Sequence, residues 1–481
     1  MSLCFYIIII SELLSIDFSN DISEIIYNNC TNCHREGQIG SFLPLTSYES
    51  VFENRYWISY AIGVGEEFRH GNPIMPPWPA DRSYSSLVDE MYLTDNEISL
   101  FSNWVDSGAM QGDPDLEYQM PDFHQGSSIG TPDLIYQMNQ PYLIEGNYQD
   151  DYRCFVIEMN NNEDIDLAAL EFIPGNLEAV HHALIVAVPA GSAYELDNSD
   201  LNYGYECFGN FQVDNTSDLL GGYAPGAFTR KWPQGLAQKI PSNSDLILQI
   251  HYAPVNVDQV DQSSINIFIK ENAVERYVQE YQMINTEFEL APNQITEVTK
   301  SYEVPVDISL VQFLPHAHLL GKYWEVYAIS YLTQDTIPII KINEWDFDWQ
   351  FFYSPEYMIF LPAGSIIHAK CIYDNTSNNL NNPNNPPEWV FWGEGTGDEM
   401  FYVPFRYVYY ESGDENIYLG TEVELLGDAN LDGLLNILDI VVIVNNIISD
   451  QSFNASNDLN ADGETNILDV VLLVSLILLN L

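Results

Sequence analysis

The feature that most constrains the fold is a series of short apolar or alternating, β-branched runs between residues 131 and 425. Clusters of Asn, Asp, Gly and Pro separate these runs, and such clusters favour tight turns. Strands spaced in this way are typical of antiparallel sandwiches. Because the span is long for one sandwich, we expect two tandem antiparallel β-sandwiches of jelly-roll type, with a break near residues 282–286. The clearest strand runs are 154–157, 183–188, 246–250 and 264–269.

The composition limits both the organisation of the chain and its partners. Its 481 residues are more than one hydrophobic core usually serves, so several domains are expected. Hydrophobic residues make up 46% of the chain, which excludes disorder throughout. The chain has 15 Lys and Arg residues against 70 Asp and Glu residues, for a formal net charge of −55. Such a field disfavours nucleic acid and anionic membranes and suits calcium or a salty medium.

A short motif near the N-terminus has the spacing of covalent c-type haem attachment. Cys30 and Cys33 would bond the haem vinyl groups, and the adjacent His34 would ligate the iron. Half of a zinc site is the alternative, but it would need a second cysteine or histidine pair nearby, and none occurs before residue 154. Met75, in a proline-rich loop that could hold its thioether in place, is the expected sixth ligand, with His70 as its rival.

A helix is expected soon after this motif. Thr94 and Glu97 form a capping box, and apolar residues then recur at helical spacing up to Val105, before Ser107 and Gly108 end the helix. It looks like the C-terminal helix of a cytochrome c domain. The apolar run at residues 5–10 could belong to a signal peptide, although no basic residue precedes it, and a mis-assigned start codon is the alternative. No run is long enough for a transmembrane span.

Histidines mark the β-rich region. In a strand, His316 and His318 would present two imidazoles on one face, which is half of a metal site. Imidazole suits copper, zinc or iron, so the remaining ligands decide the metal. The candidates are the pair at residues 181–182, the single His251, and Met400, whose soft thioether would favour copper.

Together these motifs resemble, in order and spacing, the copper type II, ascorbate-dependent monooxygenases, the family of the peptidylglycine α-hydroxylating and dopamine β-hydroxylating enzymes. The resemblance covers roughly residues 130 to 412. It rests on the His-containing motifs and the segment before Met400, at residues 181–184, 251–254, 316–322 and 396–400. Supporting stretches lie at 171–175, 222–226, 345–350 and 373–376.

The resemblance implies two copper centres on separate sandwiches that face a cleft. One copper would be held by His181, His182 and His251, and the other by His316, His318 and Met400. The Met-containing site would be catalytic and activate O2 beside a small C–H substrate, while the all-His site would store and pass an electron. Adjacent strand residues face opposite ways, so the first group requires a bulge or a strand end at its histidine pair. Reductant would come from ascorbate or an electron-donor protein, and the haem could relay electrons.

The chain departs from the family at two points. Leu314 stands where peptide-amidating members have an Arg that grips the substrate carboxylate, so peptidylglycine is not the expected substrate. Phe401 replaces the Cys that usually follows the Met ligand, which leaves Cys371 without that disulfide partner. Cys154 and Cys207 are expected to pair with each other. We interpret His124 and His368 as structural or surface residues.

The C-terminus contains a duplicated loop, residues 428–439 and 458–469, that resembles a type I dockerin. Oxygen ligands at positions 1, 3, 5, 9 and 12, with Gly at position 6, follow the logic of calcium-binding loops, and each loop leads into an apolar helix. Two calcium sites are expected, with these ligands: Asp428, Asn430, Asp432, Asn436, Asp439, Asp458, Asn460, Asp462, Asn466 and Asp469. The partner would be a cohesin-like or cell-surface protein, although such a repeat can also simply cap a chain.

The sequence therefore predicts a mainly β protein located outside the cytoplasm, in the periplasm, at the cell surface or secreted. The expected order is a candidate signal peptide at 1–18, a small α-helical cytochrome c-like domain at 19–115, β-sandwiches at 130–282 and 283–425, and a small α-helical dockerin-like domain at 426–481. The leading hypothesis is a copper monooxygenase. The alternatives are a non-catalytic copper and haem electron-transfer protein and an adhesion or scaffold protein.

Overall fold

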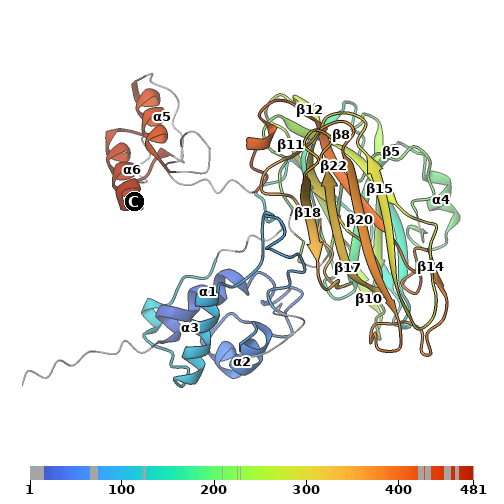
Figure 1. Ribbon diagram of the computed structural model, residues 1–481, viewed down its shortest axis with the longest axis horizontal. Coiled ribbons are helices and arrows are strands. Elements are labelled where there is room, and N and C mark those ends of the chain that lie inside the picture. The colour runs from blue at the N-terminus through green and yellow to red at the C-terminus, as the bar shows by residue number, and fades with distance from the viewer. Residues whose placement is uncertain are drawn as a thin grey trace, which may run out of the picture. The chain divides into compact units, whose positions relative to one another are not determined.

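The computed structural model describes residues 16–64, 74–121, 123, 126–207, 210–224, 226–227, 229–420, 427, 429, 435–448, 457–460 and 465–479. The protein is mainly β, and most of its strands pair in antiparallel sheets (Figure 1). The chain divides into two compact units, residues 1–419 and 420–481. Most of the candidate signal peptide, together with Cys4, His70 and His124, lies outside the described residues.

The first unit begins with a small group of helices around an aromatic core. Phe18 and Trp104 are fully buried, and their ring centroids lie 6.0 Å apart. The capping box at Thr94 and Glu97 is present, which confirms the expected helix start. Ser47 caps another helix by accepting a hydrogen bond from the Ser50 amide. The helices are η1 (Phe18–Ile22), α1 (Ser23–Asn29), α2 (Tyr48–Ala61), α3 (Asp95–Asp106) and η3 (Pro114–Leu116).

Two five-stranded sheets follow and share one hydrophobic core, to which Leu170 and Ile267 contribute from one sheet and Phe155 and Leu248 from the other. The first sheet has the order β1-β11-β4-β8-β12, with β1 (Leu134–Gln137), β11 (Ser264–Ile269), β4 (Ile165–Ile173), β8 (Leu236–Ile240) and β12 (Arg276–Tyr277). The second has the order β6-β3-β9-β5-β7, with β6 (Tyr205–Glu206), β3 (Asp151–Glu158), β9 (Ser244–Tyr252), β5 (Val180–Pro189) and β7 (Gly221–Tyr223). A short pair, β2 (Tyr142–Ile144) and β10 (Gln259–Asp261), and the helix α4 (Tyr194–Ser199) complete this half.

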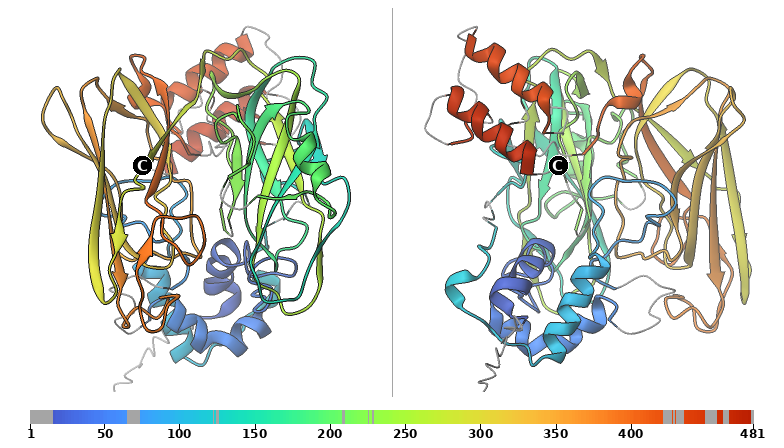
Figure 2. Two further views of the ribbon diagram at one scale, coloured as in Figure 1. Left: turned by 90° about the vertical axis from the view of Figure 1, so that its right-hand side faces the viewer. Right: turned by 60° about the vertical axis from the view of Figure 1, so that its left-hand side comes forward.

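Two four-stranded sheets form the next half, around a core that includes Trp324, Phe313 and Phe405. One sheet has the order β15-β20-β17-β18, with β15 (Gln294–Glu303), β20 (Ile366–Asn375), β17 (Gly321–Ile329) and β18 (Thr336–Ile342). The other has the order β13-β22-β16-β19, with β13 (Gln279–Ile284), β22 (Tyr402–Tyr409), β16 (Ile308–Phe313) and β19 (Ile359–Leu361). The pair β14 (Glu289–Leu290) and β21 (Val390–Phe391) and the turn η4 (Asp414–Asn416) accompany them. Figure 2 shows the sheets of the two halves beside each other.

The chain crosses between the halves at Val278. Strand β12 ends at Tyr277 and pairs in parallel with β8 of the first half, whereas β13 starts at Gln279 and pairs with β22 of the second. This crossing lies a few residues before the expected break at 282–286. The difference arises because β12 and β13 follow each other in one continuous strand-like stretch of sequence. That stretch gives no sign that β12 pairs with one half and β13 with the other.

The cysteines follow the sequence-based expectation. Cys154 and Cys207 form a disulfide with a Cα–Cα distance of 5.7 Å, which confirms that predicted pair. Cys371 is a buried free thiol. Phe401 is also buried, and its ring centroid lies 4.8 Å from that of Trp324, so an aromatic contact packs this part of the core.

The second unit contains α5 (Ile437–Ile448) and α6 (Ile467–Leu479). They pack around a small core of Ile443, Val470 and Leu473. Among the helices that the structure describes, none is both long enough and apolar enough to cross a membrane.

Candidate metal centres

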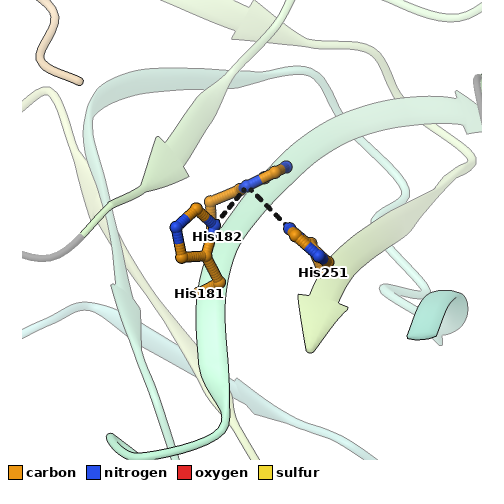
Figure 3. A group of neighbouring side chains, drawn as sticks. All are labelled: His181, His182 and His251. Atoms are coloured by element: carbon orange, nitrogen blue, oxygen red, sulfur yellow. Dashed lines mark hydrogen bonds between the residues drawn. The ribbon is translucent and has the colours of Figure 1, made fainter. Parts of the chain in front are cut away.

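Three imidazoles converge on the second five-stranded sheet (Figure 3). His181 and His182 are consecutive on β5, and His251 lies on the neighbouring strand β9. The register shifts between Val180 and His182, so β5 has a bulge where two adjacent side chains must turn towards one partner. This is the local distortion that a shared site requires of consecutive histidines.

The same ring nitrogen of each histidine takes part in this cluster. The Nδ1 atom of His182 is 3.2 Å from Nδ1 of His181 and 3.4 Å from Nδ1 of His251. The opposite nitrogen of His251, Nε2, is 2.6 Å from Oδ1 of Asp150. Since this carboxylate accepts the Nε2 proton, His251 keeps its Nδ1 lone pair for the cluster.

Burial keeps the two imidazoles of β5, His181 and His182, neutral. It lowers the pKa of His181 to about 4 and that of His182 well below the usual range, with the charge of His251 adding to both effects. His316 and His318 contribute weakly to the lowered pKa of His182, so the second histidine group lies within electrostatic range of the first. Neutral imidazoles at physiological pH are the form that binds a metal ion.

The second histidine group lies on the loop that follows β16. His316 and His318 have ring centroids 5.1 Å apart. They are not part of a continuous strand, because Pro315 offers no N–H to a ladder, although the His316 amide donates to the Tyr402 carbonyl at 2.8 Å. Nδ1 of His316 bonds the side-chain oxygen of Gln350, and Nδ1 of His318 lies 3.1 Å from the Asp398 carbonyl. In both residues, therefore, Nε2 carries the available lone pair.

A buried carboxylate that the sequence interpretation missed connects this loop to Met400. Glu399 is fully buried and accepts hydrogen bonds from the backbone N–H groups of His318 at 2.8 Å, Leu320 at 2.6 Å and Met400 at 3.2 Å. Burial raises the pKa of Glu399 to about 8, against the effect of these donors. In the sequence, only the position of Glu399 immediately before the candidate ligand Met400 indicates that it belongs to this site.

His181 and His182 of the first group, both histidines of the second group and Met400 line one cavity of about 560 Å³. Its walls include the aromatic side chains of Trp78, Phe347 and Phe351 and the apolar Leu314. Arg406 also lies in the wall, but its guanidinium is engaged by Glu280 at 3.0 Å, by Gln312 and by a backbone carbonyl.

The charge of a second arginine in the cavity wall is also neutralised by a carboxylate of the protein. Arg230 forms an ion pair with Asp89. The two arginines that line this cavity are thus each bound to a carboxylate.

The predicted haem residues lie at the end of α1. The amides of Cys33 and His34 donate to the Cys30 carbonyl, which places both thiols and the imidazole on one turn. Nδ1 of His34 lies 2.9 Å from the Leu43 carbonyl, so its Nε2 lone pair is available. Gly40 packs directly behind the ring, since a Cβ there would lie 2.7 Å from Nδ1. Two half-buried thiols beside one oriented imidazole fit covalent haem.

The expected sixth ligand lies near the end of α2. The Met75 amide donates to the Ala61 carbonyl at 2.9 Å, and the role of its thioether stays a prediction. His368, which we interpreted as structural, bonds Ser301 at 2.8 Å and stacks on Tyr327.

In the second unit, the last position of each predicted calcium loop is a buried carboxylate. Asp439 accepts from the amides of Ala429 and Asn436, and Asp469 accepts from those of Asn460 and Asn466. Among the other expected ligands, Asp458 lies among the described residues, whereas Asp428, Asn430, Asp432 and Asp462 lie outside them.

Comparisons with known proteins do not identify a family. No protein-family model and no curated protein matches the chain. Similar solved structures include the VP2 subviral particle of infectious bursal disease virus, with 10% identity over 59% of this chain and 74% of that chain and a TM-score of 0.16. Others are a Paenibacillus xanthan lyase (10%, 61% and 28%, TM-score 0.15) and a turret protein of Sulfolobus turreted icosahedral virus (8%, 57% and 98%, TM-score 0.14). TM-scores this low carry no argument about fold or function.

Proposed function

We propose that this protein is an extracytoplasmic copper-dependent monooxygenase that hydroxylates a C–H bond of a small, uncharged and largely apolar substrate with O2. One observation carries the proposal: imidazoles from two separate histidine groups, His181 and His182 of the first and His316 and His318 of the second, open onto the same cavity together with Met400. In this proposal the sheets of each half form a β-sandwich, and the cavity lies between the two sandwiches.

The donor sets fit two copper ions of different roles. His181, His182 and His251 would hold one ion through Nδ1 atoms, which makes this an all-imidazole donor set. His316 and His318 would hold the other through Nε2, with the Met400 thioether, a ligand set that favours reduced copper. Copper bound in this way would supply the one-electron steps that O2 chemistry requires.

The protein's own residues orient the ligands and shape the cavity. Gln350 and the Asp398 carbonyl fix the rings of His316 and His318, and Asp150 fixes that of His251. The aromatic wall around these groups limits the access of water to the reacting atoms.

The wall also indicates the substrate class. Arg406 and Arg230 are each compensated by a carboxylate of the protein, so a substrate carboxylate would have to displace a partner of either arginine. A third cation of the wall, Lys231, lies over the Phe268 ring, 5.0 Å from its centroid. Leu314 adds an apolar surface next to the second histidine group. A neutral substrate with aromatic or aliphatic surface therefore suits this cavity better than a charged one.

The predicted haem would be the electron source, because its motif lies near the cavity wall. Tyr223 lines the cavity on β7, and its pKa is raised to about 12 by burial and, to a smaller extent, by the nearby Cys33 thiol group. Tyr223 pairs with Ala183, the residue after the consecutive histidines. We propose that the haem supplies electrons to the all-His group, with ascorbate or a donor protein reducing the haem. The calcium-binding repeat would serve as a stabilised docking tail.

Metal analysis followed by oxygen uptake tests this proposal. We expect two copper ions and one haem per chain, and ascorbate-dependent O2 consumption that rises with an apolar C–H substrate in a panel of aromatic and aliphatic compounds. His316→Ala should abolish that increase and remove one copper. Two bound coppers with redox cycling but no product would favour the electron-transfer alternative, and zinc or no metal at the histidines would refute both.

A further inference from the structure

We propose that Tyr152 is a positioning residue that connects the two histidine groups and carries electron exchange between them. The inference rests on the proposed function, because it presumes a redox-active metal at each group. It depends on three contacts that run in sequence across the cavity wall.

The first contact is a stack between Tyr152 and His251. Their ring centroids lie 4.1 Å apart and their planes differ by only 5°. The two residues are directly opposite each other in the register of β3 and β9, so strand pairing itself holds the rings together. Asp150, just before β3, bonds the edge of the same imidazole. One short segment thus holds His251 by its face and by its edge.

The second contact reaches the other half of the β-rich region. The Tyr152 hydroxyl lies 3.4 Å from Oγ1 of Thr396, and both residues line the cavity. Thr396 belongs to the loop between β21 and β22, which is closed by hydrogen bonds from the Asp398 amide to Gly395 at 2.8 Å and from the Gly393 amide to Glu399 at 3.1 Å. The loop is therefore a defined structure and not a loose connection.

The third contact leads into the second histidine group. Asp398, two residues after Thr396, accepts a hydrogen bond from Nδ1 of His318 at 3.1 Å through its carbonyl. The route from His251 to His318 is consequently one ring stack, one hydroxyl contact, a short piece of backbone and one hydrogen bond. Phe347 also lies between the groups, with its ring centroid 5.6 Å from that of His181 and 5.8 Å from that of His318. Electrons pass through bonded and hydrogen-bonded atoms more readily than through ring contacts alone, so the Tyr152 route competes well with a crossing through Phe347.

The electron balance of the test is simple and needs no substrate. Ascorbate reduces two cupric ions to cuprous ions and is itself oxidised to dehydroascorbate with loss of protons. If exchange between the two sites is faster than reduction by ascorbate, both cupric ions disappear in a single kinetic phase. If exchange is slow, the more accessible site is reduced first, and two phases appear.

The experiment follows anaerobic reduction of the two-copper protein by ascorbate, with samples frozen at intervals and the Cu(II) spins counted by electron paramagnetic resonance. Tyr152→Phe keeps the stack but removes the hydroxyl, and Thr396→Val removes its partner at nearly constant volume. We expect one phase in the wild type. In both variants the second spin should be lost in a separate, slower phase, because the route from Tyr152 to Thr396 is broken.

Copper content and the resting spectrum of each variant serve as controls, because a purely structural role would change these and not the number of phases. A single phase of unchanged rate in both variants would refute the role of Tyr152. A wild-type protein that does not bind two copper ions would refute the proposed function instead, so the two failures are distinguishable.

Discussion

Replacing Asp150 by Ala should weaken copper binding at the all-His group and leave the second group unchanged. Asp150 Oδ1 accepts the Nε2 proton of His251 at 2.6 Å and so fixes the tautomer whose Nδ1 lone pair faces His182. Without that bond, the ring can rotate or carry its proton on Nδ1, and metal binding must then include the free energy of reorienting it. The second group has its own partners, Gln350 and Asp398, and should not respond.

The expected loss can be estimated from the geometry. Removal of a carboxylate that bonds a metal-ligating histidine typically costs about 10- to 100-fold in metal affinity, or about 1.4 to 2.7 kcal/mol. The Asp150 side chain is 39% exposed, and solvent screens its charge, so we expect the lower end, about tenfold. Asp150→Asn, which keeps an oxygen acceptor but not the charge, should lose less.

Competition with a copper chelator measures this effect, because two sites of different affinity give two separate steps. Asp106→Ala is the matched control, since Asp106 is an exposed carboxylate at the end of α3, in the helical segment that precedes the sheets. One step should shift in Asp150→Ala and neither step in the control. An equal shift of both steps, or a shift smaller than about twofold, would contradict the reasoning.

Three further predictions concern stability. In the metal-free protein, the folded-state pKa of His181 is about 4 against 6.5 for an ordinary histidine, so the unfolded chain binds the proton first and stability falls as the pH drops through this window. His181 alone should account for about 2 kcal/mol between about pH 6.5 and 5 in urea unfolding, and a flat profile would show that the ring is not buried neutral. Replacing both Cys154 and Cys207 by Ala should cost about 4 kcal/mol, from the chain entropy of a 53-residue separation, and an unchanged urea midpoint would mean that the bond does not form. Removing calcium with a chelator should speed proteolysis within residues 420–481 and spare residues 16–419, because the small core around Leu473 depends on the loops that precede it; equal cleavage rates would argue against calcium there.

The sequence was sufficient to predict the individual strands but not their partners. The runs at 154–157, 183–188, 246–250 and 264–269 lie within β3, β5, β9 and β11. Each was visible because apolar and β-branched residues are concentrated between turn residues. The crossing at Val278 was not visible, since two adjacent strands with similar patterns pair in different sheets. Local pattern sets which segments are extended, and tertiary packing decides where each of them pairs.

In the candidate site, too, the features set by local sequence were predictable and those set by tertiary packing were not. The distortion at His181 followed from strand parity once the family resemblance had assigned both histidines to one metal, because two consecutive side chains cannot share one face without a bulge. Asp150 and Tyr152 could not be predicted, since they reach His251 only through the pairing of β3 with β9 across about a hundred residues of chain. Glu399 was missed for a different reason. It follows a polar, glycine-containing stretch, and acidic residues in such stretches are normally solvated. Only its complete burial in the structure reveals that it anchors the loop that carries His316 and His318.

The segment that follows Met75 belongs to the helical part of the chain by sequence and to the cavity by contact. Trp78 lines the cavity, and its ring centroid lies 5.4 Å from that of Tyr353. Two residues later, Ala80 forms a β-bridge with Ile342, and the Asp81 amide donates to the Lys341 carbonyl at 2.7 Å. Since these contacts close one side of the cavity wall, displacing this segment from the sheets would open the cavity. This segment therefore links the part of the chain that carries the predicted haem motif, residues 30–34, to the cavity wall, and such a covalent link favours electron transfer within the chain over transfer from a separately diffusing donor.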